Sequence, residues 1–260
     1  SVLKTSLCPN HASSTRLFWA LQTHEGVNTS AISLARSVWF SFDFSTRGLI
    51  TIPRAKPNHF AENLEVMEFA LTDEDMATFK KNGSSFSTHP YINPSKGIEF
   101  STGSLGHGLS LGVGTALALK KKGNTTSKVF VMMGDGECDE GAIWEAAMSA
   151  KHFELDNIVL IIDKNKLQLD GEITTIMNHE SLGEKWKAFG WRLFEGDGHD
   201  VDDVYRVFQE ALKDQTTPVC IFMNTIKGKG VSFIENKYNW HIGVLNEEQY
   251  NQAVKELEEQ

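Results

Sequence analysis

Residues 129–141 read VFVMMGDGECDEG, and this stretch decides the fold. A short run of large and β-branched apolar residues predicts a buried strand over 128–133. Asp135 follows this strand and stands between Gly134 and Gly136. Glycine on both sides of an aspartate lets the backbone and the carboxylate approach a ligand closely. The stretch therefore predicts a buried strand that carries a carboxylate to a binding site.

The sequence on either side of this stretch alternates between helical and strand patterns. Asp200 precedes a helix and is predicted to cap it, and an amphipathic terminal helix is predicted to begin at Asn246. This alternation predicts an α/β fold, a parallel sheet with helices on both faces. The chain of 260 residues is expected to form one domain over 1–260. The predicted helices span 31–42, 62–83, 104–122, 140–152, 180–190, 200–214 and 246–260, and the predicted strands 128–133, 157–163, 191–198 and 218–225.

The composition excludes several classes of function. A formal net charge of −9 and an isoelectric point near 5.5 oppose binding to a nucleic-acid backbone. No apolar run approaches the ~18 residues that a membrane span needs. The cysteines Cys8, Cys138 and Cys220 lack metal-ligand spacing and form no disulfide framework. We therefore expect a soluble protein of the reducing cytoplasm, without a nucleic-acid or membrane partner.

Polar residues follow two consecutive predicted strands. Asn165 lies 30 positions after Asp135, about the length of a strand, a crossover helix and the next parallel strand. Ligands of open α/β sheets bind outside the carboxyl ends of the strands. A carboxylate, an amide oxygen and a nearby backbone carbonyl suit Mg²⁺ that takes its other ligands from water and phosphate. Gly-Asp-Gly alone is often only a turn. The pair at this spacing indicates a site for Mg²⁺ and a diphosphate.

Three longer segments resemble one enzyme family. GDGECDEGAIWEAAMSAKHFELDNIVLIIDKNKLQLDG (134–171) is similar to the thiamine-diphosphate motif of transketolases. HPYINPSKGIEFSTGSLGHGLSLGVGTALA (89–118) and KGKGVSFIENKYNWHIG (227–243) resemble the segments that precede and close the cofactor domain of that family. The resemblance covers 72–260, whereas 1–71 match poorly. It implies the thiamine-diphosphate-binding fold and the transfer of a two-carbon ketol unit between sugar phosphates, as in the pentose phosphate pathway.

The resemblance also implies a set of cofactor ligands. Mg²⁺ would be held by Asp135, Asn165 and the carbonyl oxygen of Leu167. The remaining cofactor contacts would come from residues around the motif and from the last matched segment. These are Gly103 and Leu105 against the thiamine, Gly134, Gly136 and Asn165 at the diphosphate, and His241.

Catalytic roles follow from the same resemblance. Glu140 would lie at a subunit contact and hydrogen-bond the partner's activating glutamate. His89 and His241 would face the sugar, where imidazole moves hydroxyl protons near neutral pH. His24 and His59 lie in the poorly matched part, and each would be a further catalytic histidine. Three more histidines, His152, His179 and His199, are interpreted as structural, and His107, where the family has Gln, as part of a helix N-terminus.

Full-length transketolases carry a second, pyrimidine-binding domain, and this sequence ends after the first. The chain thus resembles the N-terminal subunit of a split transketolase, active only with a C-terminal partner chain, as a heterotetramer with two sites. Two alternatives stay open. One is the α-subunit of a 2-oxo acid dehydrogenase, which shares the Gly-Asp-Gly and Asn pattern. The other is a non-catalytic transketolase-like subunit, to which the divergent residues 1–71 point.

Overall fold

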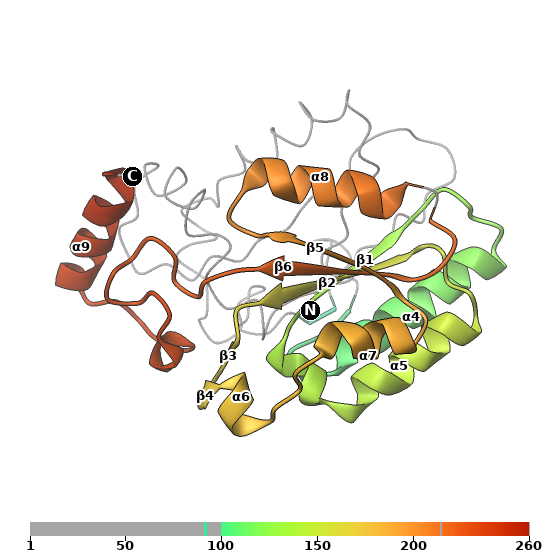
Figure 1. Cartoon of the computed structure of the whole chain (residues 1–260), viewed down its shortest axis with the longest axis horizontal. Coiled ribbons are helices and arrows are strands. Elements are labelled where there is room, and N and C mark those ends of the chain that lie inside the picture. The colour runs from blue at the N-terminus through green and yellow to red at the C-terminus, as the bar shows by residue number, and fades with distance from the viewer. Residues whose placement is uncertain (1–90, 93–99, 214, 260) are drawn as a thin grey trace.

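A computed structural model describes residues 91–92, 100–213 and 215–259 of the chain. The helices expected over 31–42 and 62–83 lie outside these residues. Figure 1 shows the described part as a sheet with helices on both of its faces.

The sheet has four parallel strands in the order β1-β2-β6-β5. They are β1 (Val129–Gly134), β2 (Ile158–Lys164), β5 (Arg192–Asp197) and β6 (Val219–Asn224). Each bound lies within one or two residues of its predicted strand. Because all four strands are parallel, their carboxyl ends meet at one edge of the sheet, and the segments that follow β2 and β6 leave from that edge (Figure 1).

Helices cover the sheet on both faces. One face is covered by α4 (His107–Lys121), α5 (Gly141–His152) and α7 (Leu182–Ala188). The other is covered by α8 (Val201–Leu212), which lies on the opposite side of the sheet in Figure 1. The predicted α/β fold with helices on both faces is confirmed.

Alternate residues of β1 supply two separate cores. Val131 and Met133 pack with α4, α5 and α7, whereas Phe130 and Met132 pack toward α8. Burying a side chain of this size stabilises the fold by roughly 1.5–3 kcal/mol. Since successive side chains of a strand point to opposite faces, a strand that is covered by helices on both faces must be apolar throughout. This is why the apolar run VFVMM (129–133) predicts a strand with helices on both faces.

Shorter elements follow the strand ends. A turn of 3-10 helix, η5 (Gly136–Asp139), follows β1, and a two-stranded hairpin follows β2. The hairpin consists of β3 (Leu167–Gln168) and β4 (Gly171–Glu172), and α6 (Ile173–Ile176) comes next. The sequence predicts none of these short elements.

The carboxyl-terminal part of the chain forms a small core of its own. The segment 231–245, which includes the 3-10 turn η6 (Tyr238–Trp240), packs on α9 (Glu247–Glu258). Val231 and Ile234 meet Ala253 and Leu257 in this cluster. We call the cluster the α9 core. Within the described residues it contains no strand residue.

The predicted cap at Asp200 is present, and the structure shows a second cap at Asn246. The side chain of Asp200 accepts hydrogen bonds from the backbone N–H groups of Asp202 and Asp203 at the start of α8. Asn246 forms a reciprocal capping box with Gln249 at the start of α9. EGDGHDVDD (195–203), which contains the first of these caps, runs from the end of β5 into the start of α8.

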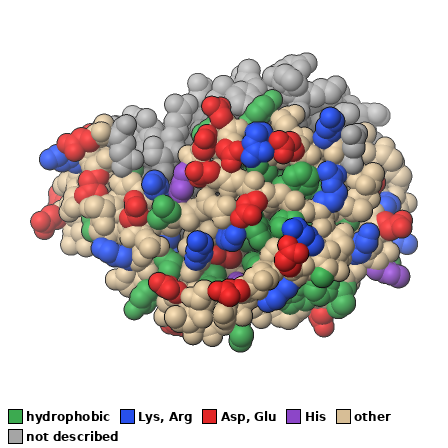
Figure 2. Space-filling model, viewed as in Figure 1, with side chains coloured by type: hydrophobic (Ala, Val, Ile, Leu, Met, Phe, Trp, Pro, Cys, Tyr) green, Lys and Arg blue, Asp and Glu red, His purple; other side chains and the backbone are tan. Residues whose placement is uncertain are grey.

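None of the helices in the described part is long and apolar enough to cross a membrane. On the face seen in Figure 2, acidic and basic side chains are interspersed and form no basic stripe.

Candidate functional site

The pairing of β1 with β2 places Asp135 beside the segment that contains Asn165. Gly134 lies opposite Asp163, and the N–H of Asp135 continues the ladder by donating to the carbonyl of Asp163 at 3.0 Å. The carboxylate of Asp135 then accepts two hydrogen bonds: Oδ1 from the N–H of Gly136 at 2.9 Å, and Oδ2 from the N–H of Lys166 at 2.7 Å. The structure thus brings both segments to one edge of the sheet.

Asp135 is a buried carboxyl group, 3% exposed. Burial, together with a smaller effect of the neighbouring charge of Asp163, raises its pKa to about 7. The two N–H bonds and the ammonium of Lys227 act in the opposite direction. Desolvation disfavours an ionised carboxylate unless a cation compensates for it. The local environment of Asp135 therefore favours a bound cation.

The amide of Asn165 is held in one orientation. Its Nδ2 donates to Oδ2 of Asp163 at 2.9 Å, and its Oδ1 accepts from the N–H of Leu167 at 3.0 Å. Asp163 also accepts from the hydroxyl of Thr225, and burial raises its pKa. A carbonyl-type oxygen has two lone pairs, so Oδ1 of Asn165 retains one for a further contact.

The oxygen ligands available at this edge are few. No group of three or more His, Cys, Asp or Glu side chains suited to a metal is found within the residues that the structure describes. A cation here would depend on one carboxylate, an amide oxygen and backbone carbonyls. This donor set fits Mg²⁺ that keeps several waters and binds phosphate oxygens.

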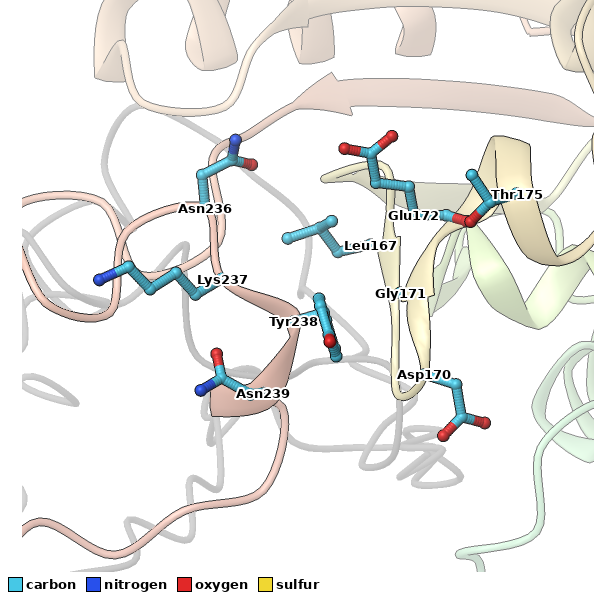
Figure 3. A pocket seen from close by; sticks show the side chains of 9 residues that line it. All are labelled: Leu167, Asp170, Gly171, Glu172, Thr175, Asn236, Lys237, Tyr238 and Asn239. Atoms are coloured by element: carbon cyan, nitrogen blue, oxygen red, sulfur yellow. The ribbon is translucent and has the colours of Figure 1, made fainter.

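A cavity of about 450 Å³ adjoins Leu167. Its walls are the β3–β4 hairpin with the start of α6 on one side and residues 236–239 on the other (Figure 3). The side chain of Leu167 lies between these walls, near Tyr238. Two segments far apart in the sequence thus lie side by side next to the predicted metal ligand.

Glu137 joins η5 to the start of α4, a contact that the sequence does not predict. Its Oε1 accepts from the N–H of Gly106 at 2.9 Å, and burial raises its pKa. Gly106 has φ of 79°, and a Cβ there would come within 2.9 Å of Cβ of Glu140. Glu140 itself is exposed at the start of α5, where its side chain makes no capping bond. Its carboxylate therefore remains available at the surface.

Asp139 ties three segments together. Its Oδ2 accepts from Nε2 of Gln168 at 2.7 Å, and its Oδ1 lies 2.8 Å from Nδ1 of His179. These contacts fasten the hairpin and the loop after α6 to the turn that precedes Glu140. The interpretation of His179 as structural agrees with this position. No local pattern identifies the pair, because 40 residues separate its members.

Other predicted cofactor residues lie near the same strand ends. Gly134 is the buried last residue of β1, and a Cβ on Gly136 would come within 2.8 Å of Cγ of Gln168. Gly103 has φ of 138°, and Leu105 is 37% exposed. His241 is buried and follows η6, where its N–H donates to the carbonyl of Tyr238 at 2.8 Å. Three predicted catalytic residues, His24, His59 and His89, lie outside the described residues.

The remaining described histidines occupy structural positions. Nε2 of His199 accepts from the N–H of Ile226 at 2.7 Å, which holds the loop after β6. His152 ends α5 and meets the edge of Phe153. His107 is the first residue of α4, as expected, with Nδ1 lying 3.0 Å from the carbonyl of Leu105.

Comparison with known proteins agrees with this geometry. Residues 61–258 match the family model described as "Transketolase, thiamine diphosphate binding domain". The chain belongs to this family. The match begins at residue 61, so it includes the last part of the weakly similar segment 1–71.

Two curated relatives of this transketolase domain are named as subunits. One subunit of the apulose-4-phosphate transketolase of Phocaeicola vulgatus is 45% identical over 189 residues, which are 73% of this chain and 66% of that protein. The 6-deoxy-6-sulfo-D-fructose transketolase subunit SqwG of a Clostridium species is 41% identical over 187 residues, 72% of this chain and 68% of that protein. The aligned part thus spans about two thirds of each relative.

Solved structures give the same fold. Transketolase from Campylobacter jejuni superposes with a TM-score of 0.67 at 30% identity, covering 73% of this chain and 30% of that one. Transketolase from Pichia stipitis gives 0.65 at 26% identity over 73% of this chain and 29% of that one. The chain therefore corresponds to less than a third of these solved chains.

Proposed function

We propose that this transketolase domain is the cofactor-binding subunit of a two-chain transketolase, which transfers a two-carbon ketol unit between sugar phosphates. The family assignment, the subunit names of the relatives and the geometry at the strand ends support the proposal. We place the enzyme in the cytoplasm, in keeping with the buried free thiols of Cys138 and Cys220.

One observation carries the proposal: Asp135 and the Asn165 segment meet at the sheet edge through the 2.7 Å bond from the N–H of Lys166. We propose that Asp135, Oδ1 of Asn165 and the carbonyl oxygen of Leu167 hold Mg²⁺. The buried carboxyl groups of Asp135 and Asp163 provide the negative charge that favours a divalent cation.

The remaining cofactor contacts surround this metal. Backbone N–H groups at the start of η5 face an incoming phosphate in our assignment, because glycines allow the backbone to approach closely. When bound, thiamine diphosphate supplies the nucleophile and the electron sink for breaking and forming the carbon–carbon bond. We assign Gly134, Gly136 and Asn165 to the diphosphate, Gly103 and Leu105 to the thiamine, and His241 to the cofactor and the substrate.

Proton handling falls to Glu140 and the histidines in this proposal. The exposed carboxyl group of Glu140 would meet the partner's glutamate and hold it in the protonation state that activation requires. His241 would donate to and accept from the sugar hydroxyls, because imidazole does both near neutral pH. We assign the same role to His89, and extend it to His24 and His59 as the further histidines of the amino-terminal part.

A partner chain is part of the proposal. Apolar side chains are exposed on the hairpin, on and just after α6, and on residues 238–244, and we call this set of side chains the hairpin face. Leu169 is 52% exposed, Met177 58% and Ile242 73%. We propose that the pyrimidine-binding subunit covers the hairpin face, in a heterotetramer with two sites. The face consists of Leu169, Ile176, Met177, Tyr238, Ile242 and Val244.

Cofactor binding by the assembled enzyme tests the metal assignment. Asp135→Ala removes the only full charge that we assign to the Mg²⁺ shell, so we expect loss of Mg²⁺-dependent thiamine-diphosphate binding with the fold largely retained. Calorimetry on the complex with the pyrimidine-domain chain measures the affinity. Asp156→Ala is a matched control, because Asp156 is exposed at the opposite end of β2. Unchanged affinity in Asp135→Ala would contradict the assignment.

Activity of the same complex separates the alternatives. We expect ketol transfer between sugar phosphates. Acyl transfer to lipoamide would favour the 2-oxo acid dehydrogenase reading instead, and the family match opposes it. Cofactor binding without turnover of any sugar phosphate would identify a non-catalytic subunit.

A further inference from the structure

The carbonyl group that we assign to Mg²⁺ belongs to the peptide bond between Leu167 and Gln168. A peptide bond is planar, so a rotation of the backbone at Gln168 also turns the carbonyl oxygen of Leu167. The preceding peptide is held, because the N–H of Leu167 donates to Oδ1 of Asn165 at 3.0 Å. What holds the chain at Gln168 therefore decides where the carbonyl oxygen points.

The hairpin that contains this peptide is short. It has two residue pairs, Leu167 with Glu172 and Gln168 with Gly171. A single two-stranded hairpin is marginally stable in water by itself. Contacts with the rest of the fold must therefore fix its position.

The side chain of Gln168 spans the 3-10 turn η5 from its first residue to its last. Its stem crosses Gly136, where a Cβ would come within 2.8 Å of Cγ of Gln168. Its Nε2 then donates to Oδ2 of Asp139 at 2.7 Å. The turn begins directly after Asp135, whose Oδ1 accepts from the N–H of Gly136. The turn η5 thus adjoins the proposed carboxylate ligand at one end and anchors the hairpin at the other.

Asp139 is itself held in place. Its Oδ1 lies 2.8 Å from Nδ1 of His179, and Nδ1 is the donor, because a carboxylate only accepts hydrogen bonds. The side chain of His179 is 11% exposed and that of Asp139 21%, so water has little access to this contact. Both oxygens of Asp139 are therefore in use, one by the hairpin and the other by the loop after α6.

We propose that Asp139 is a positioning residue for the metal, which orients the carbonyl oxygen of Leu167 by way of Gln168. This inference rests on the proposed function. Asp139 lies outside the proposed ligand set and acts only through Gln168. Hydrogen bonds that hold a metal ligand fix its orientation, and the loss of one typically costs about 10- to 100-fold in metal affinity. His179 supports the arrangement by holding Asp139.

The choice of metal gives a readout that a purely structural role would not move. Mg²⁺ requires near-ideal octahedral geometry with oxygens at about 2.0–2.1 Å, whereas Ca²⁺ accepts irregular shells with oxygens at about 2.3–2.6 Å. A carbonyl oxygen that is free to turn should therefore weaken Mg²⁺ binding more than Ca²⁺ binding. A general loss of stability should weaken the binding of both ions alike.

The test measures Mg²⁺ and Ca²⁺ binding by calorimetry in the complex of the two chains with thiamine diphosphate. Gln168→Met keeps the stem over Gly136 and loses the donor. We expect it to weaken Mg²⁺ binding about 10- to 100-fold and Ca²⁺ binding by less. Asp139→Ala should do the same. The double variant should be little worse than either single variant, because both changes break the same contact.

Two further variants separate the hydrogen bond from charge and from general effects. Asp139→Asn removes the charge but keeps an oxygen that can accept from Gln168, so it should retain most of the Mg²⁺ affinity. Gln252→Met is the matched control, because Nε2 of Gln252 donates to Oε1 of Glu256 at 2.7 Å on the exposed side of α9. It should leave both metal affinities as in the wild type. Thermal unfolding of each variant controls for folding.

Other outcomes overturn the proposal. Unchanged Mg²⁺ affinity in Gln168→Met would mean that its bond to Asp139 does not orient the carbonyl group. Equal losses for Mg²⁺ and Ca²⁺ would make the contact purely structural. A loss in Asp139→Asn as large as in Asp139→Ala would mean that the charge of Asp139 acts on the metal directly.

Failure of this proposal is distinguishable from failure of the proposed function. In each of the three outcomes above, binding of Mg²⁺ and thiamine diphosphate by the wild-type complex leaves the proposed function intact. Failure of the wild-type complex to bind them would remove the proposed function and this inference with it.

Discussion

His241 is the one predicted catalytic histidine that lies within the described residues, and it is buried beside η6. Removing a positioned acid–base group lowers rates by about 10²- to 10⁴-fold. We expect His241→Ala to lower turnover of the reconstituted enzyme at least about tenfold while cofactor binding is mostly retained. Steady-state kinetics and calorimetry measure the two effects. His152→Ala, at the exposed end of α5, should change neither.

The same kinetic series extends to the amino-terminal part of the chain. His89→Ala should behave as His241→Ala does. His24→Ala and His59→Ala should do so only if the loose match of 1–71 reflects a working active-site segment. If His24→Ala and His59→Ala leave turnover unchanged while His89→Ala and His241→Ala lower it, residues 1–71 do not contribute to catalysis. If none of the four variants lowers turnover, all four catalytic assignments are wrong.

For single residues, the sequence predicts positions that follow a strand directly. It does not predict contacts between residues that are far apart in the chain. The meeting of Asp135 with the Asn165 segment is predictable because strand ends and a spacing of 30 residues are local signals. Asp163 and Lys227 were missed because their environment depends on contacts with other strands. The Thr225 hydroxyl that holds Asp163 comes from 62 residues away.

Among the elements, α4 offers a matched test of packing against the sheet. A Cβ on Gly112 would come within 2.4 Å of Cγ2 of Val131 on β1, whereas nothing lies within 4 Å of a Cβ on Gly114. We expect Gly112→Ala to lower the free energy of unfolding, since overpacking costs about 1–3 kcal/mol. Gly114→Ala should raise it by about 0.5–1 kcal/mol through helix propensity.

Chemical denaturation of the two variants measures the difference. Both substitutions make the same chemical change in the same helix, so intrinsic propensity cancels in the comparison. Equal effects at Gly112 and Gly114 would contradict the close packing of α4 on β1.

Long elements were predictable because each carries a repeated pattern. The bounds of β1, β2, α5 and α8 fall within two residues of the sequence-based expectation. The β3–β4 hairpin was missed for a physical reason. Its two residue pairs give no alternating run, and LQLDG (167–171) resembles a plain turn.

For the whole molecule, the hairpin face is the feature with a direct consequence for assembly. If the partner covers it, Met177→Asp and Ile242→Asp should weaken association with the pyrimidine-domain chain, because each places a charge in an apolar contact. Val201→Asp is the control, since Val201 is 75% exposed at the start of α8 on another part of the surface. Sedimentation of mixtures of the two chains measures association.

Activity should follow association. The isolated chain is expected to be inactive, because Glu140 needs the partner's carboxyl group, and addition of the partner should restore turnover. Robust ketol transfer by this chain alone would contradict the two-chain proposal. Association that is unaffected by both hairpin-face variants would place the contact elsewhere.

The α9 core implies different rates of local opening at the two ends of the proposed cofactor site. Asp135 follows β1 and Asn165 follows β2, two paired strands that are buried between helices on both faces, so their ladder amide hydrogens exchange with solvent only when this part of the sheet opens. His241 belongs instead to the segment held by α9, whose small cluster can open without disturbing a strand. In deuterated water, amides of 231–258 should therefore label well before those of β1 and β2. The proposed metal ligands would stay in place while the segment that carries His241 opens and closes many times.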